Sequence, residues 1–215
     1  MGVALFDMDR TLVRRETASL YVKSRRDRGL GSWQDTARVA WWVAQYTMGV
    51  IDAPDVASRA LMVLAGTKES DLEGECEALF RKYILPHISE RARVAVAHHK
   101  ARGDHLAVVT GASPYVARPV ADYFGIENVV ASDLEVVSGA LTGRPVEPLC
   151  YGVGKVIRAN RLARKVGFAL REAVFYTDSY TDLPLLEAVA HPVVVNPDMR
   201  LSRIAEARGW PVEIW

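Results

Sequence analysis

Two carboxylates lie one residue apart near the start of the chain, directly after an apolar run. The chain reads Val3-Ala4-Leu5-Phe6-Asp7-Met8-Asp9-Arg10-Thr11 at this point. Side chains at i and i+2 of a strand point to the same face, so Asp7 and Asp9 are expected to lie close together. Two like charges at such a distance are unfavourable unless they share a cation or one carboxyl is protonated. The pair therefore suits a Mg²⁺ site with a nucleophile and a proton donor side by side.

Two more groups of polar residues follow predicted strands, and a lysine precedes one of them. Residues 106–109 are followed by Thr110-Gly111-Ala112-Ser113, and residues 173–176 by Thr177-Asp178-Ser179-Tyr180-Thr181-Asp182. Lys155 lies at the start of a basic helix ahead of the second group. In open α/β sheets, ligands bind beyond the carboxyl ends of the strands. A helix N-terminus beside a hydroxyl is also an anion site, so we expect an anion near the carboxylates.

Each of these residues also has an ordinary structural interpretation. Asp and Thr are common in loops and helix caps after strands, and Asp182 suits the cap ahead of Leu183. Lys155 is one of several basic residues on its helix. The combination favours function, because three carboxylates, a hydroxyl and a lysine all lie at strand ends or just before one.

Five apolar strands alternate with helices, which predicts a three-layer α/β fold with a mainly parallel five-stranded sheet. The strands are expected over residues 3–7, 106–109, 129–131, 173–176 and 193–195. The helices between and after them are expected over residues 90–101, 114–124, 154–166, 183–190 and 201–208. A small hairpin is expected over residues 134–142, and a short edge strand over 211–214.

Only helices are expected between residues 15 and 85, over 17–28, 33–49, 54–64 and 69–83. We therefore predict a discontinuous α/β core (residues 1–14 and 86–215) with an inserted helical cap domain (residues 15–85). The cap contains four aromatic residues, Trp33, Trp41, Trp42 and Tyr46. They either pack in the core of the cap or form a surface for a lipid or aromatic ligand.

Composition limits the kinds of partner. The 215 residues include 27 Lys and Arg against 26 Asp and Glu, so no strong field favours nucleic acid or an anionic membrane. No signal peptide is visible, and the lipophilic residues 39–51 fall short of the roughly 20 that a membrane-spanning helix needs. Cys76 and Cys150 do not suggest a disulfide framework. We expect a cytoplasmic protein, and its oligomeric state stays open.

Four segments together resemble the motifs of the haloacid dehalogenase-like (HAD) hydrolase superfamily. They are Phe6-Asp7-Met8-Asp9-Arg10-Thr11-Leu12, Val109-Thr110-Gly111, Lys155, and Tyr176-Thr177-Asp178-Ser179-Tyr180-Thr181-Asp182. The helical insertion directly after the first motif resembles the phosphoserine-phosphatase-like branch, subfamily IB. The resemblance implies a Rossmann-like HAD core with an all-helical C1-type cap.

The resemblance also implies a role for each motif residue. Asp7 would attack phosphorus and become an aspartyl phosphate, while Asp9 would protonate the leaving oxygen and then activate water. Mg²⁺ would bind Asp7, the main-chain carbonyl of Asp9 and Asp178, with Asp182 supporting the coordination shell. Thr110 and the Gly111 N–H would hold the phosphoryl oxygens, and Lys155 would neutralise charge. A dehalogenase would not need Asp9, so the carboxylate pair favours a phosphatase.

Several residues bear on the substrate. Arg10 stands where family members commonly carry a small residue, and Thr181 stands where phosphoserine phosphatases have Asn. Glu16 matches in position a Glu that reads the substrate ammonium in that branch, although a carboxylate at a helix start is also favoured by the helix dipole. Arg59 lies in the region of an Arg that reads the carboxylate of phosphoserine.

These observations predict a phosphoric monoester hydrolase. The expected reaction is the Mg²⁺-dependent hydrolysis of a small phosphomonoester, phosphoserine-like or another metabolite, through an aspartyl-phosphate intermediate. One alternative is a phosphatase of a lipid or aromatic phosphate, with the aromatic cap reading the substrate. The other is a catalytically weak module that binds a phosphate ligand.

Overall fold

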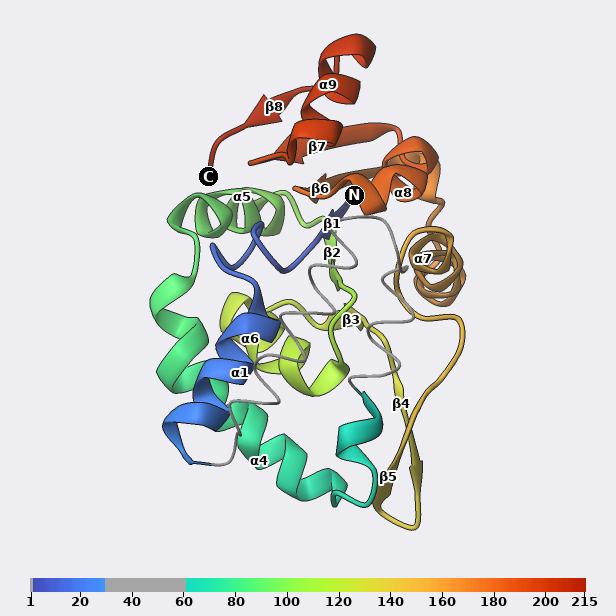
Figure 1. Ribbon diagram of the computed structural model, residues 1–215. Helices are drawn as coiled ribbons and strands as arrows, with labels where there is room; N and C mark the ends of the chain where they lie inside the picture. The colour runs from blue at the N-terminus through green and yellow to red at the C-terminus, as the bar shows by residue number, and fades with distance from the viewer. Residues whose placement is uncertain (1, 30–60) are drawn as a thin grey trace.

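A six-stranded parallel sheet forms the centre of the computed structural model, which describes residues 2–29 and 61–215 (Figure 1). The strand order is β3-β2-β1-β6-β7-β8. The strands are β1 Val3–Phe6, β2 His105–Val109, β3 Asn128–Val130, β6 Ala173–Thr177, β7 His191–Val195 and β8 Val212–Glu213.

The predicted α/β class is confirmed, but the count of five strands is wrong. The sixth strand, β8, pairs with β7 where the sequence predicted a short edge strand. It has only two residues, both exposed, so no buried apolar run marks it in the sequence.

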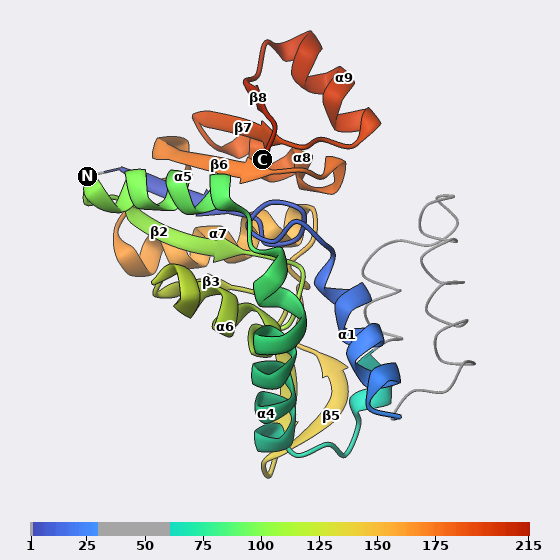
Figure 2. The same ribbon diagram turned by 90° about the vertical axis from the view of Figure 1, so that its left-hand side faces the viewer.

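Helices cover both faces of the sheet, as the continuous apolar strands predict. Successive side chains of β1 point to opposite faces, which places Ala4 and Phe6 in one core cluster and Val3 and Leu5 in another. The first cluster includes residues of α5 (Glu90–Ala101) and α6 (Pro114–Phe124), and the second includes residues of α7 (Val153–Val166), α8 (Leu183–Ala188) and α9 (Met199–Arg208). Figure 2 shows α5 in front of the sheet and α7 behind it.

A second group of elements extends away from the sheet and lies below it in both views (Figures 1 and 2). It contains α1 (Thr17–Asp27), α4 (Glu69–Leu79) and the antiparallel hairpin of β4 (Leu134–Val137) and β5 (Ala140–Pro145). Leu72 and Cys76 of α4 pack against Leu141 of β5. The single helix predicted over residues 69–83 is an α-helix followed by a π-helical turn, η2 (Phe80–Ile84).

Part of the predicted cap lies outside the described residues. This part includes Arg59 and the four aromatic residues Trp33, Trp41, Trp42 and Tyr46. The division into a core and a cap at residues 15–85 therefore stays a prediction.

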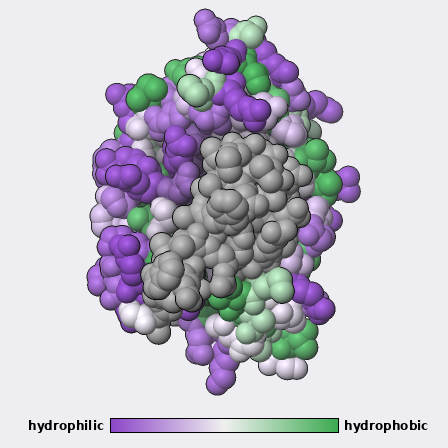
Figure 3. All heavy atoms as spheres, viewed as in Figure 1, coloured by the Kyte–Doolittle hydropathy of each residue, from purple (hydrophilic) through white to green (hydrophobic). Residues whose placement is uncertain are grey.

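The described surface is mainly hydrophilic in the view of Figure 3, with hydrophobic spheres gathered below, over η1 (Met62–Leu64) and the β4–β5 hairpin. Exposed apolar residues in these elements are Met62, Val63 and Val137. Within residues 2–29 and 61–215, no helix has the length and hydrophobicity needed to cross a bilayer. Cys76 and Cys150 are buried free thiols.

The central position of β1 makes its packing important for stability. Leu5 is fully buried, so Leu5→Ala should lower the free energy of unfolding by about 2–5 kcal/mol, through lost apolar contact and a residual cavity. Denaturant titration followed by circular dichroism would measure the change. Val94→Ala is the control, because Val94 is 71% exposed on α5 and should change stability little. A loss at Leu5 no larger than at Val94 would contradict the described core.

Candidate active site

Strand register brings the predicted site segments to one edge of the sheet. Phe6 of β1 is paired with Val108 of β2 on one side and with Tyr176 of β6 on the other. The Asp7 N–H continues this pairing by donating to the Tyr176 carbonyl at 2.8 Å. The segments that follow β1, β2 and β6 therefore begin side by side, because parallel strands in this register end at the same level.

The buried Lys155 joins two of the predicted carboxylates. Its Nζ donates to Oδ1 of Asp7 at 2.7 Å and to Oδ2 of Asp182 at 2.6 Å. The Thr177 hydroxyl donates to the same oxygen of Asp182 at 2.7 Å. All four residues are buried. These ion pairs and hydrogen bonds thus connect the end of β1, the start of α7 and the turn after β6.

Two glycines allow α7 to begin where Lys155 can reach Asp7. Gly152 precedes the helix with φ +49° and ψ −123°, which side-chain-bearing residues rarely adopt. A Cβ on Gly154 would lie 2.0 Å from the Leu149 carbonyl oxygen, so only glycine permits this approach.

Arg158, one turn further along α7, fixes the loop before the helix. Its guanidinium donates to the carbonyls of Pro148 at 2.5 Å and Val146 at 2.6 Å, and to the Asp133 carboxylate at 2.5 Å. The sequence showed it only as one basic residue among several on a helix, yet it is buried. Its burial follows from the loop that folds over it.

Asp9 is directed toward the start of α1. Its Oδ1 accepts from the Thr17 N–H at 2.8 Å, in the first turn of that helix. Burial raises the pKa of Asp9 to about 6, the Thr17 hydrogen bond opposes this rise, and the nearby Glu16 charge adds to it. Glu16 itself is exposed at the N-cap position of α1.

The pKa values of Asp7 and Asp178 are both raised. Burial is the main cause of a pKa of about 7 for Asp7 and about 8 for Asp178, and the Asp7 charge adds to the rise at Asp178. Lys155 opposes the rise at Asp7, and Arg10, whose Nε lies 3.3 Å from Asp178 Oδ2, opposes it at Asp178. Burial alone would lower the pKa of Lys155, but Asp182 and Asp7 raise it above its ordinary value.

This donor set fits Mg²⁺. Asp7 and Asp178 are buried carboxylates whose repulsion a divalent cation would relieve. Asp182 instead contacts Lys155 and Thr177. In the described parts of the chain, no group of three or more His, Cys, Asp or Glu side chains is arranged to hold a metal. Mg²⁺ commonly binds one or two carboxylates and fills its other positions with water and phosphate oxygens.

Thr110 and Gly111 follow β2 at the same edge of the sheet as Asp7. The Thr110 N–H donates to the Val130 carbonyl at 2.9 Å, so it is not free to donate to a ligand. The Thr110 hydroxyl accepts from the Ala112 N–H at 3.2 Å. A Cβ on Gly111 would lie 2.5 Å from the Tyr151 ring, so a side chain at this position would have to displace that ring.

The structure thus brings Asp7, Asp182 and Lys155 into direct contact, and places Arg10 on Asp178. It leaves Glu16 in solvent beside Asp9, and Arg59 lies outside the described residues. Sequence reasoning did not single out Thr177 or Arg158, nor Asn196 and Asp198 in the turn after β7. Polar residues at a strand end were the one available signal for Thr177.

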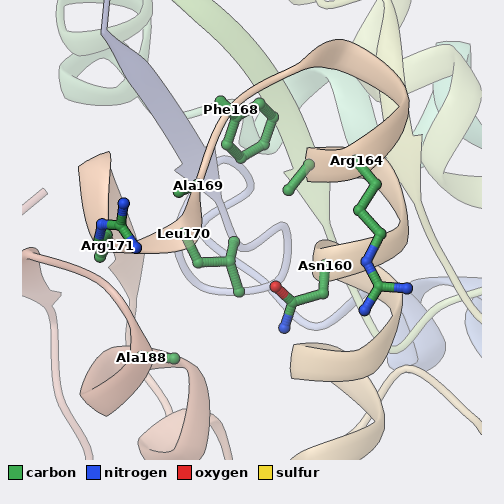
Figure 4. Close-up of a pocket in the computed structure, with 8 residues that line it drawn as sticks. Asn160, Arg164, Phe168, Ala169, Leu170, Arg171 and Ala188 are labelled. Carbon is green, nitrogen blue, oxygen red and sulfur yellow. The ribbon is translucent and has the colours of Figure 1, made fainter.

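A separate surface pocket of about 340 Å³ lies beside the second half of α7 (Figure 4). Its lining includes Asn160, Arg164, Phe168, Leu170, Arg171 and Ala188, and none of the predicted site residues. It is therefore distinct from the carboxylate cluster.

Comparison with known proteins identifies the family. The model of a family described as haloacid dehalogenase-like hydrolase matches residues 4–187. The chain belongs to this family. A histidinol-phosphatase of Neisseria meningitidis serogroup C (strain 8013) is 32% identical over 98% of this chain and 97% of its own length. The phosphoserine phosphatase SerB1 of Mycobacterium tuberculosis (strain ATCC 25618 / H37Rv) is 30% identical over 98% of this chain and 70% of its own length.

Solved structures confirm the HAD-like fold. A protein of unknown function from Bordetella pertussis Tohama I has a TM-score of 0.90 and 34% identity, covering 98% of this chain and 97% of that one. A phospho-aspartyl intermediate analogue of a phosphoserine phosphatase has a TM-score of 0.72 and 19% identity, covering 99% and 92%. The predicted resemblance to the phosphoserine-phosphatase-like branch of the HAD family is thereby confirmed.

The raised pKa values predict how the stability of the metal-free HAD protein depends on pH. The folded-state pKa values of about 7 for Asp7 and 8 for Asp178 exceed the ordinary value of 3.8, so the folded state binds protons more tightly than the unfolded state. Their contribution to stability is therefore fully present below about pH 4 and is lost as the pH rises through 7 to 8. Asp178→Asn removes one of these two titrating groups.

Denaturant titration in EDTA at mildly acidic and mildly alkaline pH would measure this effect. The free energy of unfolding should fall more with rising pH in the wild type than in Asp178→Asn. Asp122→Asn, an exposed change on α6, is the control and should behave like the wild type. An equal fall in all three proteins would contradict the prediction.

Proposed function

We propose that this HAD-family protein is a Mg²⁺-dependent phosphatase that hydrolyses a small phosphomonoester through an aspartyl-phosphate intermediate. The observation that carries the proposal is the buried contact of Lys155 with Asp7, beside Asp178 and at the edge where Thr110 and Gly111 lie. The relatives named histidinol-phosphatase and phosphoserine phosphatase support it.

In the first step, a carboxylate oxygen of Asp7 attacks phosphorus as the bond from phosphorus to the leaving oxygen breaks. Asp7 must be ionised to do so, and the Lys155 ammonium at 2.7 Å favours the ionised form. Asp9 gives its proton to the leaving oxygen. Its pKa of about 6 leaves part of the population protonated near neutral pH, which suits a general acid.

In the second step, water attacks the aspartyl phosphate and Asp9 takes the proton of that water. Phosphate leaves, and the Asp7 carboxylate is restored. The Thr17 N–H, which donates to Asp9 at 2.8 Å, holds the carboxyl in one orientation for both proton transfers. Mg²⁺, bound by Asp7, Asp178 and the Asp9 carbonyl, would neutralise charge on the phosphoryl oxygens.

Glu16 points to the class of substrate. It is exposed at the start of α1, and its negative charge raises the pKa of the proposed general acid Asp9. Histidinol phosphate and phosphoserine, the substrates implied by the two relatives' names, both carry a primary ammonium group. A carboxylate next to the leaving-group side of the site would pair with such a group. We therefore assign the substrate to the amine-bearing phosphomonoesters.

Removing the nucleophile tests the proposed chemistry. The wild type should release phosphate from p-nitrophenyl phosphate steadily with Mg²⁺ and lose this activity in EDTA, whereas Asp7→Asn should show no turnover above background. Asp122→Asn should keep the wild-type rate. Absence of Mg²⁺-dependent turnover by the wild type on any phosphate ester would refute the proposed function.

Neutralising Glu16 tests the substrate class. Glu16→Gln should lower kcat/KM for histidinol phosphate or phosphoserine about tenfold or more, the usual effect of losing a hydrogen bond between charged groups. Its kcat/KM for glycerol phosphate, which lacks an amine, should change little. Glu90→Gln, in the first turn of α5, is the matched control. Equal losses on substrates with and without an amine would rule out the assignment.

A further inference from the structure

The turn after β7 contacts both loops that carry the proposed metal ligands. Asn196 donates from Nδ2 to the Arg10 carbonyl at 3.2 Å. The Asp198 N–H donates to the Asp178 carbonyl at 3.0 Å, and Asp198 Oδ2 accepts from the Tyr180 N–H at 2.8 Å. Residues 196–198 therefore hold the backbone next to Asp9 and the backbone of Asp178 at the same time.

This turn is itself firmly anchored. Asn196 Oδ1 accepts from the Trp215 N–H at 2.9 Å, and the Asn196 N–H donates to the Glu213 carbonyl at 2.9 Å. Asp198 Oδ1 caps α9 by accepting from the N–H groups of Arg200 and Leu201, both at 2.8 Å. The position of the turn, and of the site loops that it contacts, therefore depends on α9 and on the C-terminal segment.

The sheet alone does not set the separation between the two loops. β6 lies between β1 and β7, so the turn reaches past the end of β6 to Arg10. Arg10 and Asp178 both follow the last paired residues of their strands, beyond the β1–β6 ladder. Arg10 also has a positive φ of 57°, a conformation that needs support from outside.

We propose that Asn196 and Asp198 are positioning residues that hold the Asp9–Arg10 and Asp178–Tyr180 backbones at the separation required for binding Mg²⁺. Both residues contact the site loops through main-chain groups, so they would act through the residues that they hold. This inference rests on the proposed function, because it takes Asp7, Asp178 and the Asp9 carbonyl as the ligands.

Two nearly isosteric variants remove one contact each. Asp198→Asn keeps an oxygen to cap α9, since Asn is as good an N-cap as Asp, but places an amide donor against the Tyr180 N–H. Asn196→Asp keeps the acceptor for Trp215 and tolerates a positive φ, but places an oxygen against the Arg10 carbonyl. One variant removes a negative charge near the site and the other adds one.

Calorimetric titration of the metal-depleted full chain with MgCl₂ measures the effect without turnover. We expect both variants to bind Mg²⁺ about tenfold more weakly, the usual cost of losing a partner that orients metal ligands. Turnover of p-nitrophenyl phosphate at saturating Mg²⁺ should stay close to that of the wild type. A pure charge effect would instead weaken binding in Asp198→Asn and strengthen it in Asn196→Asp, and that result would overturn the proposal, as would unchanged affinity in both.

Ser89→Ala separates positioning from general stability. Ser89 caps α5 by accepting from the Ala92 N–H at 3.2 Å, so its loss should lower the melting temperature but leave Mg²⁺ affinity unchanged. If Ser89→Ala weakens Mg²⁺ binding as much as the turn variants do, the positioning role is refuted.

The same titration distinguishes this inference from the proposed function. A wild type that binds no Mg²⁺ overturns both. A wild type that turns over substrate, with variants of unchanged Mg²⁺ affinity, overturns the positioning role alone. Weakened binding in both variants without any wild-type turnover supports the positioning role and refutes the phosphatase.

Discussion

The buried ammonium group of Lys155 is the interaction on which the site depends. A charge removed from water is unfavourable unless it is paired and hydrogen-bonded, and Lys155 meets this condition by lying between Asp7 and Asp182. Lys155 and Asp7 are 148 positions apart in sequence, so the contact depends on the packing of α7 against the sheet. Gly152, Gly154 and Arg158 hold α7 in the place where this pairing is possible. The packing of the helix and the chemistry of the site therefore depend on the same contact.

The cluster holds more negative charge than Lys155 neutralises. Asp7, Asp9 and Asp178 all have raised pKa values, with burial as the main cause. A group of carboxylates that is unfavourable in the isolated protein is suited to a ligand that brings positive charge. Buried carboxylates without enough positive partners would be unusual in a structural core, but such groups are expected at functional sites. The Asp9 contact with Thr17 adds a link to α1, so the orientation of the proposed acid depends on the first helix of the predicted cap.

Topology explains why residues so distant in sequence meet here. β1 lies inside the sheet, and its neighbours β2 and β6 end level with it, which gathers the segments after all three strands. β7 contributes no predicted site residue, yet its following turn reaches both Arg10 and Asp178. The C-terminal part of the chain is thus connected to the site by hydrogen bonds, although it lies beyond the last predicted motif.

The sequence by itself determined the α/β class, most helix bounds and the residues of the carboxylate cluster. These depend on local signals: the alternation along β1, the apolar runs of the strands, and polar residues at strand ends. Only the tertiary structure decided that Arg158 is buried and that Asn196 and Asp198 contact the site loops. Asn196 and Arg10 are 186 positions apart, and a contact over that separation cannot be predicted from the hydrophobic periodicity of the sequence. Its existence depends on strand order and loop path, which are set by the packing of the whole chain.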